Sequence, residues 1–318
     1  MPEKEATRSR SMFMKHPLSP RMFILLLLAL PALTGMDCQG NPAVPFVPMY
    51  SLRASISGQG TVERVTADGS VSFTDGNFAE GSTVTLRALP AEGWHFVRWE
   101  GAASTSDAQI ALTVEQDQAV TAVFVAVAGH RTVTIQGIIG RITLAVRNGQ
   151  VRGNFRSSNL GTDIEGTVIG DQLSLTSTAP GFSNASIQAS IQPDGSLLGT
   201  INGSGFSNSP WMADPVTLFG FEDDASGQRT TALDGFNGIM TIVVSEGVLR
   251  GTWRMFASYG ADLEGVVSEN QVTFSVATPG FTTATVTASI LPDGSWAGTI
   301  NGSGYNNAAF SAQPSFFP

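Results

Sequence analysis

The stretch Gly199-Thr-Ile-Asn-Gly-Ser-Gly205 recurs unchanged at 298–304, and it shows most clearly that the chain contains one unit twice. Around it, residues 131–215 align with residues 229–314 from end to end with a single one-residue gap. Roughly four in ten of the aligned positions are identical, which is typical of an internal duplication. Most of the 318-residue chain is therefore predicted to be a repeated scaffold.

Each copy has the alternation of β-strands and no helical period. In the first copy, Ile142, Leu144 and Val146 alternate with other residues until Asn148-Gly149. Asn-Gly between alternating apolar runs predicts a tight hairpin, because both residues tolerate a positive φ. The whole pattern predicts about seven strands per copy. We therefore expect an all-β fold, with each copy an antiparallel meander that forms a barrel or a sandwich. Glycines inside the strands favour the barrel, because they permit strong curvature.

The one-residue gap between the copies has a predicted place. It should fall in the loop between Arg156 and Gly161, where the second copy has Arg254 to Gly260. An insertion inside a strand would turn every later side chain to the opposite face of the sheet.

The N-terminus has the pattern of an export signal. Lys15 and Arg21 precede an apolar run over residues 22–33 that is too short to span a bilayer. The only cysteine, Cys38, follows this run. It is either the lipid-bearing first residue of a bacterial lipoprotein, although Asp37 before it fits that pattern poorly, or an incidental cysteine near the cleavage site. The proline-rich residues 38–50 predict an extended tether.

Residues 51–126 read as a separate β module. Its motifs are Ser57-Gly-Gln-Gly-Thr-Val62, Gly81-Ser-Thr-Val-Thr-Leu86, Ala91-Glu-Gly-Trp-His-Phe-Val-Arg-Trp-Glu-Gly101 and Val120-Thr-Ala-Val-Phe124. In this order they resemble the divergent internalin B-type repeat family of bacterial surface proteins. The resemblance implies a small β-grasp-like fold on an exported or envelope protein, no catalysis and no transferable ligand site. Trp94, Phe96 and Trp99 are the large rings that a small core needs.

Charge and composition argue against several functions. The formal net charge is −9, so a phosphate backbone or an anionic lipid surface would repel the chain. His95 and His130, the histidines after the export signal, have no partner at metal-ligand spacing. The sequence contains no nucleophile elbow and no cofactor loop. We therefore predict no catalytic residues, no cofactor, no metal and no nucleic-acid partner.

One charged pattern occurs in both copies. Two arginines on one strand precede two carboxylates on the next, and side chains two residues apart share a face. One interpretation is a cross-strand ladder of ion pairs, with Arg156 opposite Asp163. The others are a polar ligand groove, or a carboxylate pair that performs acid–base chemistry on a glycan. The eight residues are Arg152, Arg156, Asp163, Glu165, Arg250, Arg254, Asp262 and Glu264.

Aromatic residues at loop ends are the second candidate. Phe182 and Phe281 follow Pro-Gly in matching loops, and Phe206 and Tyr305 follow the Gly-Ser-Gly ends. Such rings either contact a ligand or close the open end of a barrel.

The sequence thus predicts an exported cell-envelope or secreted protein, anchored to a membrane only if Cys38 is lipidated. Its expected role is non-catalytic surface display, adhesion, or binding of an extracellular glycan or protein. The alternatives are a small-molecule carrier that uses barrel interiors and, more weakly, a glycan hydrolase. The predicted organisation is a signal at 1–37, a tether at 38–50, a module at 51–126, copies at 131–217 and 229–318, and a linker at 218–228.

Overall fold

A computed structural model of the chain describes residues 46–316 except 159, 182, 219–224 and 257. The predicted signal, Cys38 and most of the tether lie outside these residues. The first strand, β1, begins at Met49, so the end of the predicted tether belongs to the module instead. No helix within the described part of the chain is long and apolar enough to cross a membrane.

The first folded part consists of two four-stranded sheets, in the orders β4-β1-β8-β6 and β3-β2-β5-β7. The first and last strands, β1 and β8, pair in parallel. Trp99 is fully buried in the core and donates from Nε1 to the carbonyl oxygen of Asp107 at 3.1 Å, whereas Trp94 is half-buried. The strands are β1 (Met49–Ser57), β2 (Gly60–Thr66), β3 (Gly69–Ser72), β4 (Asp75–Ala79), β5 (Ser82–Pro90), β6 (Trp94–Gly101), β7 (Gln109–Val114) and β8 (Gln118–Ala126).

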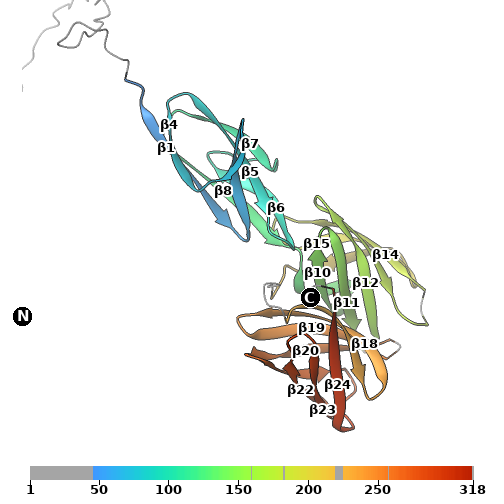
Figure 1. Cartoon of the computed structure of the whole chain (residues 1–318). Coiled ribbons are helices and arrows are strands. Elements are labelled where there is room, and N and C mark those ends of the chain that lie inside the picture. The colour runs from blue at the N-terminus through green and yellow to red at the C-terminus, as the bar shows by residue number, and fades with distance from the viewer. Residues whose placement is uncertain (1–45, 159, 182, 219–224, 257, 317–318) are drawn as a thin grey trace, which may run out of the picture. The chain divides into compact units, whose positions relative to one another are not determined.

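Each sequence copy forms a closed antiparallel barrel of eight strands (Figure 1). Barrel 1 is closed by pairing of β11 with β12, and barrel 2 by pairing of β20 with β21. Each copy is therefore a barrel and not a sandwich.

The strands of barrel 1 are β9 (Gly129–Ile135), β10 (Ile138–Arg147), β11 (Gln150–Ser157), β12 (Leu160–Ile169), β13 (Gln172–Thr178), β14 (Ala185–Ile191), β15 (Leu197–Gly203) and β16 (Phe206–Ala213). Those of barrel 2 are β17 (Gly227–Leu233), β18 (Phe236–Ser245), β19 (Val248–Met255), β20 (Tyr259–Ser268), β21 (Gln271–Ala277), β22 (Ala284–Ile290), β23 (Trp296–Gly302) and β24 (Tyr305–Phe316).

The sequence pattern missed the last strand of each barrel. In barrel 1 this strand is β16, which pairs with β15 and with β9 and so completes the ring. Pro210 lies in its middle, and a proline inside a run weakens a strand prediction. The buried Trp211 next to it points into the core.

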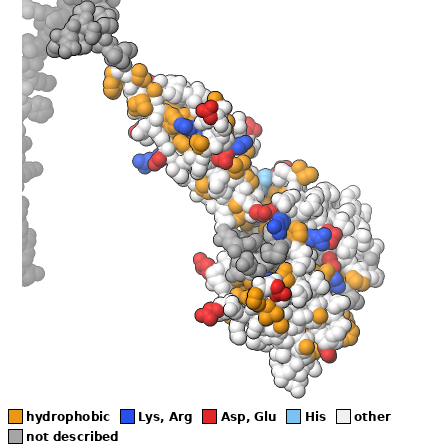
Figure 2. Space-filling model, viewed as in Figure 1, with side chains coloured by type: hydrophobic (Ala, Val, Ile, Leu, Met, Phe, Trp, Pro, Cys, Tyr) orange, Lys and Arg blue, Asp and Glu red, His pale blue; other side chains and the backbone are white. Residues whose placement is uncertain are grey.

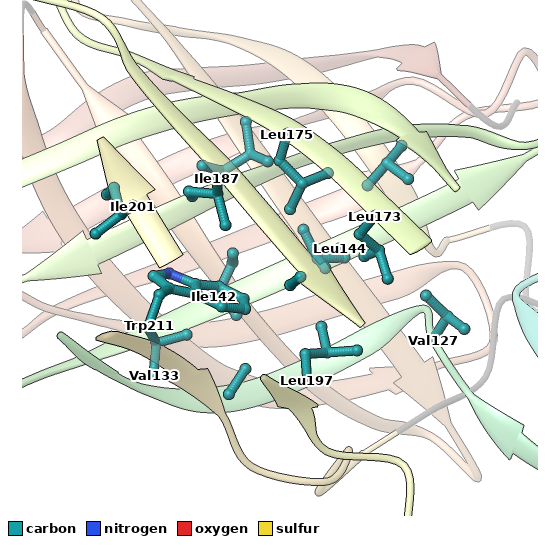
Figure 3. Packing of buried hydrophobic residues seen from close by; sticks show 14 of the residues in the cluster. Val127, Val133, Ile142, Leu144, Leu173, Leu175, Ile187, Leu197, Ile201 and Trp211 are labelled. Carbon is teal, nitrogen blue, oxygen red and sulfur yellow. The ribbon is translucent and has the colours of Figure 1, made fainter. Parts of the chain in front are cut away.

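The interior of barrel 1 is filled by side chains. Figure 3 shows Trp211, Ile142, Ile187 and Ile201 directed into the space that the strands enclose, and all four are buried. Barrel 2 has an equivalent core that is richer in aromatic rings, with Trp253, Phe274, Trp296 and Phe310. The Trp253 and Phe310 centroids are 5.7 Å apart in an edge-on arrangement.

The glycines inside the strands permit close approach of neighbouring backbones. A Cβ added to Gly199 would lie 1.9 Å from the carbonyl oxygen of Gln188 on the adjacent strand. At Gly298, the matching position of barrel 2, the distance to the carbonyl oxygen of Thr287 would be 2.0 Å. These distances leave no room for a side chain at either position.

Both local expectations about turns are confirmed. The additional residue of the second copy lies between the ends of β19 and β20, at Met255 and Tyr259, in the predicted loop. Asn148 and Gly149 have φ values of 50° and 73°, the pair of positive angles that a type I′ hairpin requires.

Candidate functional site

Four of the eight predicted charged residues form ion pairs between the barrels. Arg156 of β11 donates from Nε to Oδ1 of Asp262 of β20 at 2.9 Å, and its Nη2 contacts the other carboxylate oxygen. In return, Arg254 of β19 donates from Nε to Oδ1 of Asp163 of β12 at 2.7 Å. Since Arg156 matches Arg254 and Asp163 matches Asp262 in the repeat, the two contacts are reciprocal.

The expectation that Arg156 lies opposite Asp163 is wrong. In the ladder between β11 and β12, Arg156 faces Gly161, whereas Asp163 faces Asn154. Asn154 donates from Nδ2 to Oδ1 of Asp163 at 2.8 Å, so this carboxylate is hydrogen-bonded within its own barrel as well as by Arg254.

Glycines and small polar residues let the barrels approach each other. The backbone N–H of Gly161 donates to the carbonyl oxygen of Ser258 at 2.6 Å. A Cβ on Gly260 would lie 2.5 Å from Cγ of Arg156. Asn154 is fully buried and accepts a hydrogen bond from Oγ1 of Thr241 at 2.6 Å. We name this contact of β10–β12 with β18–β20 the barrel interface.

The other four charged residues form the predicted ladder within each copy. Arg152 lies 3.0 Å from Glu165, and Arg250 lies 3.2 Å from Glu264. All four side chains are exposed by 40% or more, so each pair contributes at most about 1 kcal/mol. Figure 2 shows acidic and basic side chains scattered over the visible face, without a field of one sign on its described part.

His130 is buried beside the barrel interface. Its Nδ1 lies 2.9 Å from Oγ1 of Thr143. Burial lowers the pKa of His130 to about 4, and the charges of Arg141, Arg250 and Arg156 add to this effect. The imidazole is therefore neutral at physiological pH, and its burial and its contact with Thr143 indicate a structural role.

A buried arginine closes one end of barrel 1, and sequence reasoning missed it. Arg131 is fully buried and donates hydrogen bonds at 2.8 Å to the carbonyl oxygens of Ala126, Val127 and Gly195. Burial lowers its pKa to about 9, so the guanidinium remains charged at neutral pH.

Barrel 2 repeats this feature. Arg229 donates from Nη1 to the carbonyl oxygen of Gly294 at 2.6 Å, and its Cζ lies 4.3 Å from the ring centroid of Trp296. The position of each arginine in the strand alternation could have revealed it. Arg131 lies two and four residues before the buried Val133 and Ile135, so all three share the inward face of the strand.

The opposite end of each barrel is hollowed. The first end pocket, in barrel 1, has a volume of about 130 Å³ and reaches inward to Trp211. The second end pocket, in barrel 2, has a volume of about 220 Å³. It is lined by Met255, Phe256, Tyr259, Val276, Thr278, Phe281, Thr282, Ala284, Ile300, Ser303 and Tyr305.

The loop-end aromatics lie at these pockets. Phe206 lines the first and Tyr305 lines the second, and each packs against its core. Phe281 lines the second end pocket with 56% of its surface exposed. Phe182 lies outside the described residues.

A metal site has no support in the described residues, where no group of three His, Cys, Asp or Glu side chains could hold an ion. His95 is half-buried at the edge of the module, and burial lowers the pKa of its imidazole.

Comparison with known protein families gives a match for one part of the chain. Residues 61–128 match the divergent InlB B-repeat domain, which confirms the resemblance of the module. A repeat of this type indicates a surface-associated bacterial repeat protein. Neither the curated proteins nor the solved structures gave a significant match to the chain.

Proposed function

We propose that this protein is displayed at the bacterial cell surface and binds an extracellular ligand, a protein or a glycan, without turnover. The InlB-type repeat at residues 61–128 carries the proposal, because such repeats belong to surface-associated proteins. The reciprocal ion pairs add support, since they hold the two barrels as one body that presents two end pockets.

Binding at the barrel ends is better supported than carriage inside the barrels. Ligand pockets for small molecules usually occupy about 300–1,000 Å³. The end pockets measure about 130 and 220 Å³, and packed side chains fill the interiors behind them.

The carboxylates are engaged in ways that favour a structural role. Asp163 and Asp262 accept hydrogen bonds from arginines of the opposite barrel. Glu165 and Glu264 lie on the exposed ladder.

The test is to incubate the labelled full chain with arrays of bacterial and host glycans and proteins, and to measure both retention and chemical change of each ligand. Saturable retention of an unchanged ligand is expected. A ligand that is consumed by the parent chain but not by an E165Q/E264Q double variant would overturn the non-catalytic proposal.

A further inference from the structure

The two end pockets have the same place in the repeat but different walls. Four wall positions have diverged, from Ser157, Leu160, Ser177 and Phe206 in barrel 1 to Met255, Tyr259, Val276 and Tyr305 in barrel 2. Every change gives the second end pocket a larger or more polarizable side chain. The first end pocket therefore serves as an internal control for the second.

The aromatic core of barrel 2 moves its pocket toward the rim. Phe274 and Phe310 pack with centroids 6.0 Å apart, and the rings of Trp253 and Trp296 lie beside them. None of these four rings lines the second end pocket, whereas Trp211 lines the first. The second cavity is thus enclosed mainly by side chains at the mouth.

The mouth has exposed aromatic rings that are already arranged for ring contacts. Tyr259 and Phe281 meet edge-on, with centroids 6.0 Å apart and an interplanar angle of 87°. Tyr259 and Phe281 are 44% and 56% exposed, respectively. A further ring in the cavity would cover part of this apolar surface, and an aromatic pair contributes about 0.5–1.5 kcal/mol beyond the burial of area. The thioether of Met255 offers another favourable contact with a ring.

The lining selects against charge. Its described residues carry aliphatic, thioether, aromatic or hydroxyl side chains, and none is charged. An ionised group that entered the cavity would lose hydration without gaining a partner. A sugar would leave most of its hydroxyls without the carboxylate or amide partners that hold them in place.

The size fits one ring. An apolar cavity of about 150 Å³ accepts benzene in another protein, and the second end pocket is somewhat larger, at about 220 Å³. We infer that the second end pocket is a binding site for a single uncharged aromatic ring, and that the first end pocket is not. The inference rests on the proposed function, because it names the chemical group that the barrel end would recognise.

The test uses p-cresol, a neutral substituted ring, titrated into the full chain by isothermal calorimetry and saturation-transfer NMR. The T282W variant places a large ring at the exposed rim of the second end pocket and should weaken p-cresol binding at least tenfold. The matched control is S183W, at the corresponding exposed position of barrel 1, which should leave the affinity unchanged. F281A removes a wall without filling the cavity and should weaken binding severalfold.

Two further probes identify the source of the ring. If N-acetyl-tyrosinamide binds as well as p-cresol, the ring belongs to a side chain of a partner protein, whereas exclusive binding of p-cresol indicates a free small molecule. Both outcomes support the inference. It is overturned if p-cresol does not saturate the chain, if S183W abolishes binding while T282W does not, or if methyl β-glucoside displaces p-cresol at lower concentration. A chain that binds an array ligand but not p-cresol refutes this inference alone and leaves the proposed function standing.

Discussion

Replacing Arg254 with alanine should destabilise the barrel pair by about 2–3 kcal/mol. Arg254 and Asp163 are 12% and 19% exposed in their side chains, so the pair is nearly buried. Removing one partner of a fully buried pair costs about 3–5 kcal/mol, because the remaining charge has lost its compensation. The loss here should be smaller, since Asn154 still donates a hydrogen bond to the carboxylate.

The assay is urea unfolding of the full chain followed by tryptophan fluorescence. R250A is the matched control, because Arg250 forms the exposed pair with Glu264 and should cost less than about 1 kcal/mol. In a double-mutant cycle, R254A and D163A should show a coupling energy of about 1–3 kcal/mol. If R254A unfolds at the same urea concentration as R250A, or if the coupling energy is zero, the reasoning about the barrel interface is wrong.

Three more perturbations have defined outcomes. The pKa of His130 falls to about 4 in the folded chain from the ordinary histidine value of 6.5, so protons bind preferentially to the unfolded state between these values. Stability should therefore fall by up to about 3 kcal/mol as the pH drops from 7 to 4, and H130Q should lose most of that slope in pH-dependent melting; an unchanged slope contradicts the assignment. W99A should cost about 3–5 kcal/mol and unfold the module, as seen by loss of its protected amides in hydrogen exchange, whereas W94A should cost less; equal effects would show that the core is misplaced. G199A should prevent closure of barrel 1, because no Cβ fits 1.9 Å from the carbonyl oxygen of Gln188; a variant with parental circular dichroism and melting temperature would refute the close approach.

Local chemistry made much of the fold predictable. Alternation of apolar residues located most strands, Asn148-Gly149 identified a hairpin, and the rule that an insertion reverses strand faces located the gap. The InlB-type module was recognisable because the residues of its motifs also form its own core, so the pattern is contained within this one segment. The strand with Pro210 was missed because the proline weakens the local strand pattern. Its pairing with β9, which closes the barrel, is long-range and leaves no local signal.

The charged residues show where such reasoning ends. Alternation states which face Asp163 shares with Glu165, but it does not state which arginine reaches that face. Arg156 and Arg254 have equivalent neighbours in sequence, so the two pairings are indistinguishable until the barrels are placed together. The end pockets could not be predicted from the sequence either, since their walls combine residues from strands and loops far apart in the chain.

The reciprocal ion pairs also bear on how many barrels such a chain can hold. A two-fold contact uses the same face on both partners, so it is complete once two copies have met. A third barrel added by another duplication would bring strands equivalent to β10–β12, but both existing faces would already be occupied. A third barrel would therefore have to join through a different surface, unlike an added unit in stacked repeats, in which every unit offers a new surface to the next.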